Sequence, residues 1–388
     1  MNNFEYIYNQ DPPLISFPNS KNENWKYINL NSLKEKLDKN VNINRGHPIF
    51  KNQKINNHFI MNDDSIKLNK NLPKGISIDI IEVEKISYLD SRLKDKFGKI
   101  AKIDDYFILE NTQKFNQLII INITKDANLK DTLNLAIEVS GNISIKPRFL
   151  IYSEKKSSSS IQITYHDSEA TINGLFEIYL EDKSTMNFVG LNKSENSVEI
   201  LNYWFKMNKN TNLKATFLSM GDQQILKNDI RVDLVGENAN ADMGGLYIPK
   251  SNSTIDYNLK MNHLSKRTLS NQFFRGILNK HSKASFTGLV KIKKGCINSK
   301  SNQVNNNLLL SEKAQIKSDP QLEIYCDDVE CSHGSTIGQF DEDALFYLLS
   351  RGIGKKDAKK MLIEAFYGDI LNRINSLDIQ EMINQSIS

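Results

Sequence analysis

Cys331 and His333 are separated by a single serine, and acidic residues stand close by in the stretch DDVECSHGSTIGQF, residues 327 to 340. A thiol and an imidazole are good ligands for zinc, copper and iron, and a thiol beside a base is the core of cysteine catalysis. Three interpretations are open: part of a metal site, a nucleophile with its base, or an inert pair at the end of a half-buried strand.

The spacing argues against a metal site built by this segment alone. Four residues separate Cys326 from Cys331, whereas zinc ribbons use a two-residue gap and repeat it, and no second pair exists here. On a strand, residues i and i+2 lie on one face with Cα atoms about 6 to 7 Å apart. Cys331 and His333 would then be two ligands, and a tight site would need more from elsewhere, including from a partner chain.

Catalysis by the same pair has little support in the sequence. Neighbours on one strand face are usually too far apart for a hydrogen bond between thiol and imidazole. The acids Asp327, Asp328 and Glu330 should raise the pKa of the Cys331 thiol, which makes it a poorer nucleophile. The chain contains no Gly-x-Ser-x-Gly, P-loop or dinucleotide-binding pattern. We therefore predict no catalytic residues.

The composition limits the partners and the compartment. Of the 388 residues, 39% are apolar and 25% charged, as in soluble globular proteins, and the formal net charge of +4 does not favour nucleic acid. No apolar run is long enough to span a bilayer, and the start, MNNFEYIYNQDPP, lacks the cationic segment of a secretory signal. Three cysteines form no disulfide framework. We expect a protein of the cytoplasm, or of an equivalent reducing organelle stroma, without a membrane partner.

The residues that would position the pair belong to a long β-rich zone. Between about residues 76 and 339, short runs alternate apolar and polar residues and are separated by Asn, Ser, Gly, Asp or Lys. Examples are Ile161 to Tyr165, Phe176 to Leu180, Leu213 to Phe217, Ile230 to Leu234 and Ile255 to Leu259. A sandwich, a propeller and a parallel β-helix all remain open. The irregular spacing and the Asn-rich turns favour the β-helix, because Asn tolerates the left-handed conformation.

Helical patterns flank this zone, so we divide the chain into residues 1–75, partly helical, 76–339, the β body, and 340–388, helical. Asp341 is a good N-cap, and a second apolar pattern should end at Gly368. A third helix should begin near Asp378, which has an acid three residues on. A tail of this size cannot build its own core, so it must dock on the β body or on another chain.

Residues 307 to 353 closely resemble the C-terminal core of the SufB/SufD family of iron–sulfur cluster assembly proteins. The Cys-Ser-His-Gly form, with Thr336, Gly338 and Asp341, resembles the SufD branch of the family. Two further stretches are similar to other parts of that branch: FPNSKNENWKYINL, residues 17 to 30, and NHLSKRTLSNQFFRGIL, residues 262 to 278. Cys326 and Lys266 depart from the common pattern, and the segment before Pro18 is short.

The resemblance implies a right-handed parallel β-helix between helical ends and a non-catalytic scaffold function. In that family the β body pairs with SufB, and the C-terminal helices bind the SufC ATPase. His333, with Cys331 beside it, would then be a metal ligand of a transient Fe–S cluster shared with SufB and not held tightly by this chain alone. The SufC-docking residues would be Leu345, Leu348, Leu349, Leu362 and Phe366.

Two alternatives remain at this stage. The chain could be a SufB-like scaffold that acts in a complex of identical subunits. It could also be a β-helix enzyme acting on polysaccharides, although such an enzyme needs clustered acids along one face and usually a secretion signal. The roles of Cys296 and Cys326 stay open in all of these interpretations.

Overall fold

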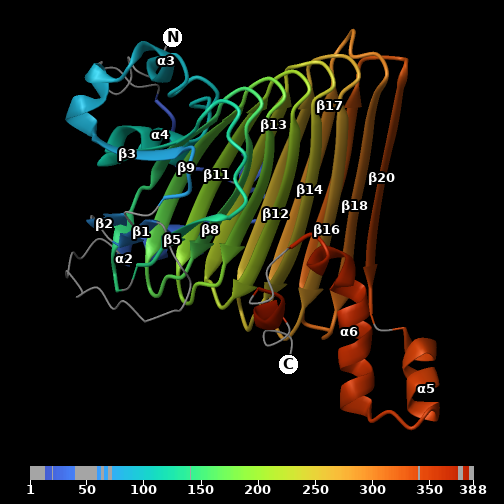
Figure 1. Ribbon diagram of the computed structural model, residues 1–388. Helices are drawn as coiled ribbons and strands as arrows, with labels where there is room; N and C mark the ends of the chain where they lie inside the picture. The colour runs from blue at the N-terminus through green and yellow to red at the C-terminus, as the bar shows by residue number, and fades with distance from the viewer. Residues whose placement is uncertain are drawn as a thin grey trace.

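The structure, a computed structural model, describes residues 14–19, 21–39, 59–62, 65–68, 72–139, 141–339, 341–374 and 379–383. It confirms a mainly β protein with a parallel β-helix body, a few short helices near the N-terminus and helices at the C-terminus (Figure 1). The chain winds around one axis, and each coil adds one strand to each of two sheets.

The first sheet, sheet A, holds ten strands in the order β2-β1-β5-β8-β10-β12-β14-β16-β18-β20. Their bounds are β1 Phe59–Asn62, β2 Ser65–Leu68, β5 Leu133–Ile137, β8 Ser158–Tyr165, β10 Thr185–Asn192, β12 Asn212–Gly221, β14 Asn240–Pro249, β16 Leu269–Leu278, β18 Ser299–Leu309 and β20 Val329–Gly338. All neighbours pair parallel except β1 with β2.

The second sheet, sheet B, runs β19-β17-β15-β13-β11-β9-β7-β4-β3, and the short strand β6, Ser144–Ile145, pairs with β9. The bounds are β3 Ile76–Glu82, β4 Gln117–Ile123, β7 Arg148–Ser153, β9 Thr171–Leu180, β11 Val198–Met207, β13 Ile225–Leu234, β15 Thr254–His263, β17 Lys283–Ile292 and β19 Gln315–Ile324. Only β3 runs antiparallel, against β4.

The coils differ in length, which explains the irregular strand spacing of the sequence. Thr171 pairs with Val198, 27 residues on, whereas Lys283 pairs with Gln315, 32 residues on. Positive φ angles recur at the turns, and Asn196, Asn210, Asn238 and Asn298 are among them, as the Asn-rich turns predicted. Lysine, serine and arginine take this conformation in other turns, where nothing in the residue type predicted it.

The core lies between the two sheets and consists of the inward residues of the alternating runs. Ile161, Ile163 and Tyr165 of β8 are buried, and so are the matching residues of the strands around it. Rings stack from coil to coil: Phe149, Phe176 and Tyr203 follow one another with centroids 4.8 and 4.7 Å apart. Stacked equivalent positions make one continuous apolar column, which is what holds a solenoid together.

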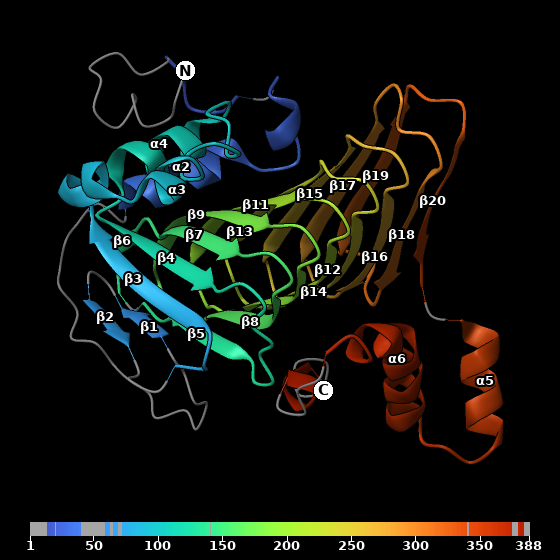
Figure 2. The same cartoon turned by 45° about the horizontal axis from the view of Figure 1, so that its top comes forward.

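Helices and turns from the first third of the chain cover the outer face of sheet B (Figure 2). They are η1 Glu23–Trp25, α2 Leu30–Lys39, η2 Val83–Tyr88, α3 Ser91–Lys94 and α4 Tyr106–Lys114. Trp25 and Leu33 pack with Phe107 over β11 and β13. Residues 83 to 114, which contain η2, α3 and α4, therefore form a helical insertion between β3 and β4 and not another coil of the solenoid.

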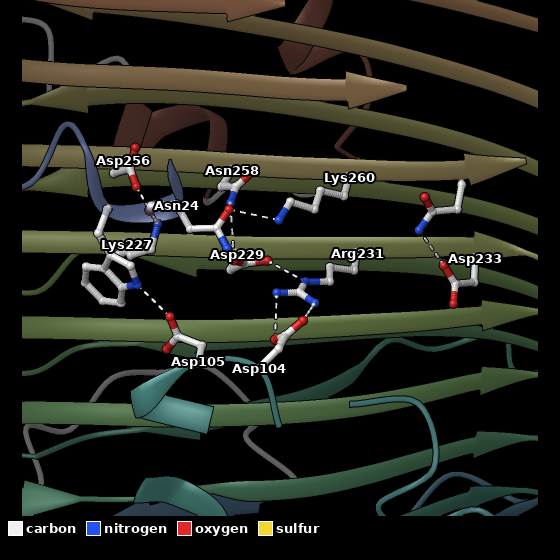
Figure 3. A network of polar contacts seen from close by, with 12 residues as sticks. Asn24, Asp104, Asp105, Lys227, Asp229, Arg231, Asp233, Asp256, Asn258 and Lys260 are labelled. Atoms are coloured by element: carbon white, nitrogen blue, oxygen red, sulfur yellow. Dashed lines mark hydrogen bonds and ion pairs between the residues drawn. The ribbon is translucent and has the colours of Figure 1, made fainter. Parts of the chain in front are cut away.

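A buried network of ion pairs fastens this N-terminal cover to sheet B (Figure 3). Lys227 donates to the Asp256 carboxylate at 2.6 Å and to the Asn24 carbonyl oxygen at 2.7 Å. Arg231 pairs with Asp104 at 2.9 Å, and the Trp25 indole donates to a carboxylate of the α4 N-cap. Lys227 and Asp256 lie on neighbouring strands of sheet B. The contacts that join the cover to sheet B are those to Asn24 and Asp104, and they fix where the cover lies.

The C-terminal helices are α5, Glu342–Ser350, and α6, Lys355–Leu371, and residues 379–383 are also helical. Asp341 caps α5 by accepting from the backbone of Asp343 and Ala344, as predicted. The expected helix end at Gly368 is wrong, because α6 continues to Leu371. Asp378, the expected start of the third helix, lies outside the described residues.

The C-terminal segment covers the outer face of sheet A, and so the two faces of the solenoid are covered from opposite ends of the chain. Tyr367, Ile370 and Ile374 are buried against apolar residues of β10, β12, β14 and β16. Helix α5 packs on α6 and stands farther from the strands in both views (Figures 1 and 2). The tail was expected to dock either on the β body or on another chain, and helix α6 packs on the β body.

Candidate functional site

The Cys-Ser-His segment lies on β20, the last strand of sheet A. β20 is bonded to β18 on one side, and among the described residues no strand pairs with its other side. β19 ends sheet B in the same way, next to β17. The last coil therefore offers two free strand edges side by side, with unpaired backbone groups that can accept further strands.

Cys331 and His333 point to the inner side of this last coil. Cys331 pairs with Ser301 and His333 with Gln303, and both residues on β18 are buried. Cys331 is half-buried and packs against the end of the core, whereas His333 is exposed. The structure thus puts both side chains on one strand face, as the spacing predicted, with the imidazole open to a ligand from outside.

Burial raises the pKa of the Cys331 thiol, and a hydrogen bond from the Ser301 backbone N–H opposes that shift. The direction agrees with the sequence-based expectation, but the cause is desolvation and not the neighbouring acids. At neutral pH the thiol keeps its proton, so it is a weak nucleophile, and binding of a metal ion would release a proton.

Beneath the pair, the interior of the solenoid becomes polar. The buried ring of His263 bonds Thr268 at 2.8 Å and Ser270 at 2.9 Å, and the Ser270 hydroxyl bonds that of Ser301 at 2.8 Å. This chain of hydrogen bonds ends under Cys331, since Ser301 is its strand partner. Burial lowers the pKa of His263 to about 4, so the ring is neutral at physiological pH.

A second polar ladder runs under His333 and the residues after it. Gln303 donates to Gln272 at 2.8 Å, and Asn305 donates to the Tyr247 hydroxyl at 2.9 Å. Ser335 of β20 bonds Ser318 of β19 at 2.7 Å, which ties the two edge strands together. Sequence reasoning missed these ladders, although serine, glutamine and asparagine at the inward positions of the late strands were a visible signal.

The chain supplies few metal ligands at this edge. Nowhere in the described ranges do three or more His, Cys, Asp or Glu side chains gather in a way that could hold a metal ion. Cys331 and His333 are a soft thiol and an imidazole, a donor set that suits iron, but they are two donors only. The arrangement can therefore contribute to a site that other ligands complete.

The predicted docking leucines divide between the interior and the surface. Leu345 is buried at 5% exposure, Leu348, Leu362 and Phe366 are half-buried, and Leu349 is exposed. Three other large apolar residues of α5 and α6 are more exposed and are not among the predicted docking residues: Phe346, Tyr347 and Met361. The five residues remain a prediction. The surface that another protein could reach consists of the four exposed apolar residues of these helices, Phe346, Tyr347, Leu349 and Met361.

A family model described as "SUF system FeS cluster assembly, SufBD core domain" matches residues 136–366. The chain belongs to the SufB/SufD family. That match covers the solenoid from its early coils, the Cys-Ser-His strand, helix α5 and most of helix α6. Membership confirms the predicted family and gives no support to the polysaccharide-enzyme alternative.

Relatives agree with the SufD branch at moderate identity. The chain is 33% identical to the iron–sulfur cluster assembly protein SufD of Escherichia coli K12 over 159 residues, which are 41% of this chain and 38% of that protein. It is 26% identical over 318 residues to a SufBD family protein of Synechocystis, covering 76% and 69% of the two chains. A SufBD family protein of Mycobacterium tuberculosis is 22% identical over 282 residues, 70% and 71% of the chains.

The match to the E. coli protein spans well under half of its length, and the family as a whole is an iron–sulfur cluster assembly family. In the part of the chain that the structure describes, no helix has the length and apolar character needed to cross a bilayer.

Proposed function

We propose that the chain is a non-catalytic scaffold subunit of a SufB–SufC–SufD complex that assembles iron–sulfur clusters. In this proposal residues 76–339 carry the edge that pairs with SufB, and residues 340–388 carry the dock for the SufC ATPase. ATP hydrolysis belongs to SufC, and the compartment is the cytoplasm or an equivalent reducing stroma. The observation that carries the proposal is the open last coil with Cys331 and His333 on its edge strand.

Two free strand edges favour a partner that continues the sheets. Edge strands of monomeric proteins are usually short, charged or covered, because free edges pair with other chains. Here β19 and β20 are ten residues each, and apolar side chains of their coil are exposed: Ile324, Tyr325 and Ile337. A second β-helix of the same family has edges of the same spacing, so its last coil could pair with this one strand by strand.

A cluster site divided between two chains explains the sparse donor set. His333 is the accessible ligand, and Cys331 supports it from a half-buried position. Neither donor can hold a cluster alone, so SufB must supply the others. Ligands from two chains separate when the chains move apart, which suits a cluster that is passed on, because affinity then depends on the contact between the chains.

The test is reconstitution of the three-protein complex with His333→Ala. The variant should fold and assemble normally, because His333 is exposed, yet form less cluster by absorbance and by iron and sulfide assay. His281→Ala is the matched control, since His281 is exposed in the turn between β16 and β17 and not on β20. Cys331→Ala should have a smaller effect. Full cluster yield with His333→Ala would remove the ligand assignment.

The exposed apolar residues of α5 and α6 support the SufC dock. Phe346 is 72% exposed and Tyr347 57% exposed, on a helix that is held away from the strands. Aromatic residues left in water beside a buried anchor such as Leu345 are typical of contact surfaces.

Point variants test this dock better than a deletion, because removing residues 340–388 would also uncover the apolar outer face of sheet A. Phe346→Ser should reduce SufC co-purification at least tenfold and leave circular dichroism unchanged. Ser350→Ala, on the same helix, is the control and should bind normally. Unchanged SufC binding by Phe346→Ser would place the dock elsewhere.

A further inference from the structure

Two cysteines occupy equivalent corners of the last two coils. Cys296 lies in the turn between β17 and β18, and Cys326 lies in the next turn on that side, between β19 and β20. Each stands three residues before the paired positions Ser299 and Val329. The Asn298 N–H donates to the Asp328 carbonyl oxygen at 2.7 Å and holds the two turns together.

Residues stacked in adjacent coils lie within the range that a disulfide can bridge. Neighbouring strands of a parallel sheet lie about 4.8 Å apart, and disulfides bridge Cα atoms about 4.4 to 6.8 Å apart. Both side chains pack against the end of the same core, Cys296 buried and Cys326 at its margin. Burial raises the pKa of the Cys296 thiol, and the nearby Cys326 thiol adds to that shift.

The two thiols differ in access. Cys296 is 2% exposed, and its Sγ donates to the His263 carbonyl oxygen at 3.3 Å. Cys326 lines an open surface depression of about 640 Å³ together with the side chains of Lys293 and Lys294. A reagent from solution can therefore reach Cys326 first. The two lysines outnumber the one carboxylate of the lining, Asp327, and this charge favours an anionic reagent.

We propose that Cys296 and Cys326 form a redox-responsive pair that closes to a disulfide when an anionic low-molecular-weight disulfide enters this depression. The Cys326 thiol loses a proton, and its sulfur attacks the reagent, which forms a mixed disulfide and expels one thiolate. Cys296 then loses its proton and attacks the Cys326 sulfur, which expels the second thiolate. The reagent is reduced to two thiols, which take up the two protons, and the pair loses two electrons.

Closure would act on the last coil. The bond would link the turn that leads into β20 to the coil before it, five residues ahead of Cys331. Cross-linking residues about 30 apart restricts the unfolded chain and local opening of the segment between them. Amide exchange in β19 should therefore slow in the oxidised form, whereas exchange in β9, far along the solenoid, should not change.

The experiment uses the full chain prepared without oxygen and then incubated with oxidised glutathione. After remaining thiols are blocked with N-ethylmaleimide, peptide mass spectrometry should find Cys296 joined to Cys326 and Cys331 alkylated. In Cys296→Ser the reaction should stop at glutathione on Cys326, and in Cys326→Ser no adduct should form at Cys296. Cys331→Ala is the control and should oxidise like the unchanged chain.

The disulfides and alkylated thiols found by mass spectrometry in the unchanged chain decide the proposal even if a variant folds poorly. A bond between Cys326 and Cys331, or glutathione remaining on Cys326 with Cys296 alkylated, would overturn the pairing. Three alkylated thiols after incubation would overturn the reactivity of Cys326. None of these outcomes depends on SufB, SufC or cluster formation, so the pair can fail without affecting the scaffold proposal.

Discussion

Arg373 is predicted to be the main polar anchor of the C-terminal segment on the β body. Its guanidinium donates to both carboxylate oxygens of Asp242 at 2.9 Å and to the Asp242 carbonyl oxygen at 2.9 Å. Gly244 leaves the room for it, because a Cβ there would lie 2.3 Å from the arginine Nε. The arginine side chain is 11% exposed and that of Asp242 33%.

The size of the effect of Arg373→Ala follows from these contacts. Hydrogen bonds to charged groups contribute about 1.5 to 3 kcal/mol each, but they are not additive here because one guanidinium makes them all. Asp242 is partly exposed and can be hydrated again after the change, so the cost stays below the about 3 to 5 kcal/mol of a fully buried pair. We expect a loss of about 2 to 3 kcal/mol, which is roughly a 30- to 150-fold change in the opening equilibrium.

Hydrogen exchange is the assay, because local opening exposes the amides of α6 while the strands stay closed. Asp369→Asn is the matched control: its ion pair with Arg275 also joins α6 to sheet A, but Asp369 is 66% exposed. Such pairs contribute about 0 to 1 kcal/mol, so the control should change exchange by less than about fivefold. Equal effects of the two variants, or loss of protection in β16 with Arg373→Ala, would refute the reasoning.

Two further predictions concern buried charges. Burial raises the pKa of both Asp167 and Glu199, whose carboxyl groups share the Ser194 hydroxyl, so the folded state holds their protons more tightly than the unfolded state. Their contribution to stability is therefore complete below about pH 4 and is lost as the pH rises. In urea titrations, the free energy of unfolding of Asp167→Asn should rise relative to that of the unchanged chain between pH 4 and pH 8. A difference between the two free energies that does not depend on pH would contradict this. Lys227→Met leaves Asp256 buried without its cation and should cost about 3 to 5 kcal/mol, measured by urea unfolding followed through the fluorescence of Trp25. A loss below about 1 kcal/mol would show that the Lys227–Asp256 pair in Figure 3 does not stabilise the fold.

The solenoid was predictable from the sequence because its determinants are local. Each inward residue is two positions from the next, and the alternation in runs such as Ile230 to Leu234 reports burial on one face directly. The covering of the outer faces was not predictable in the same way. Trp25 and Phe107 meet over β11 and β13 only because the chain returns there, and no local pattern carries that information.

The error at Gly368 has a similar cause. Glycine in a helix costs about 1 kcal/mol relative to alanine, which made it a reasonable end for α6. The helix continues because Tyr367 and Ile370, on either side of it, are buried against sheet A. Burial of two large side chains contributes more than the glycine costs, so the tertiary contact decides the local structure.

Only part of the candidate site could be predicted from the sequence. Types and spacing were enough to place Cys331 and His333 on one strand face, because a period of two needs no tertiary information. The polar residues of the ladder from His263 to Ser301 were visible at inward positions, but their pairing was not. Ser270 and Ser301 are 31 residues apart and meet only through the register of β16 and β18. The exposed apolar residues of α5 were missed for a related reason: apolar spacing marks what a helix buries, such as Leu345, rather than what it leaves exposed, such as Phe346.

One end of the solenoid is capped and the other is open, and this difference is the best structural argument for a partner. Stacked coils need a cap at each end, because the last coil otherwise exposes its core and its strand edges. At the first end, antiparallel strands β2 and β3 terminate the sheets and helices cover sheet B. At the other end the chain has helices at hand, yet α6 packs on the outer face of sheet A and, among the described residues, no element covers the β19 and β20 edges. An end that stays open although cover is available nearby supports the proposal that another chain pairs with it, and it is the end that carries Cys331 and His333.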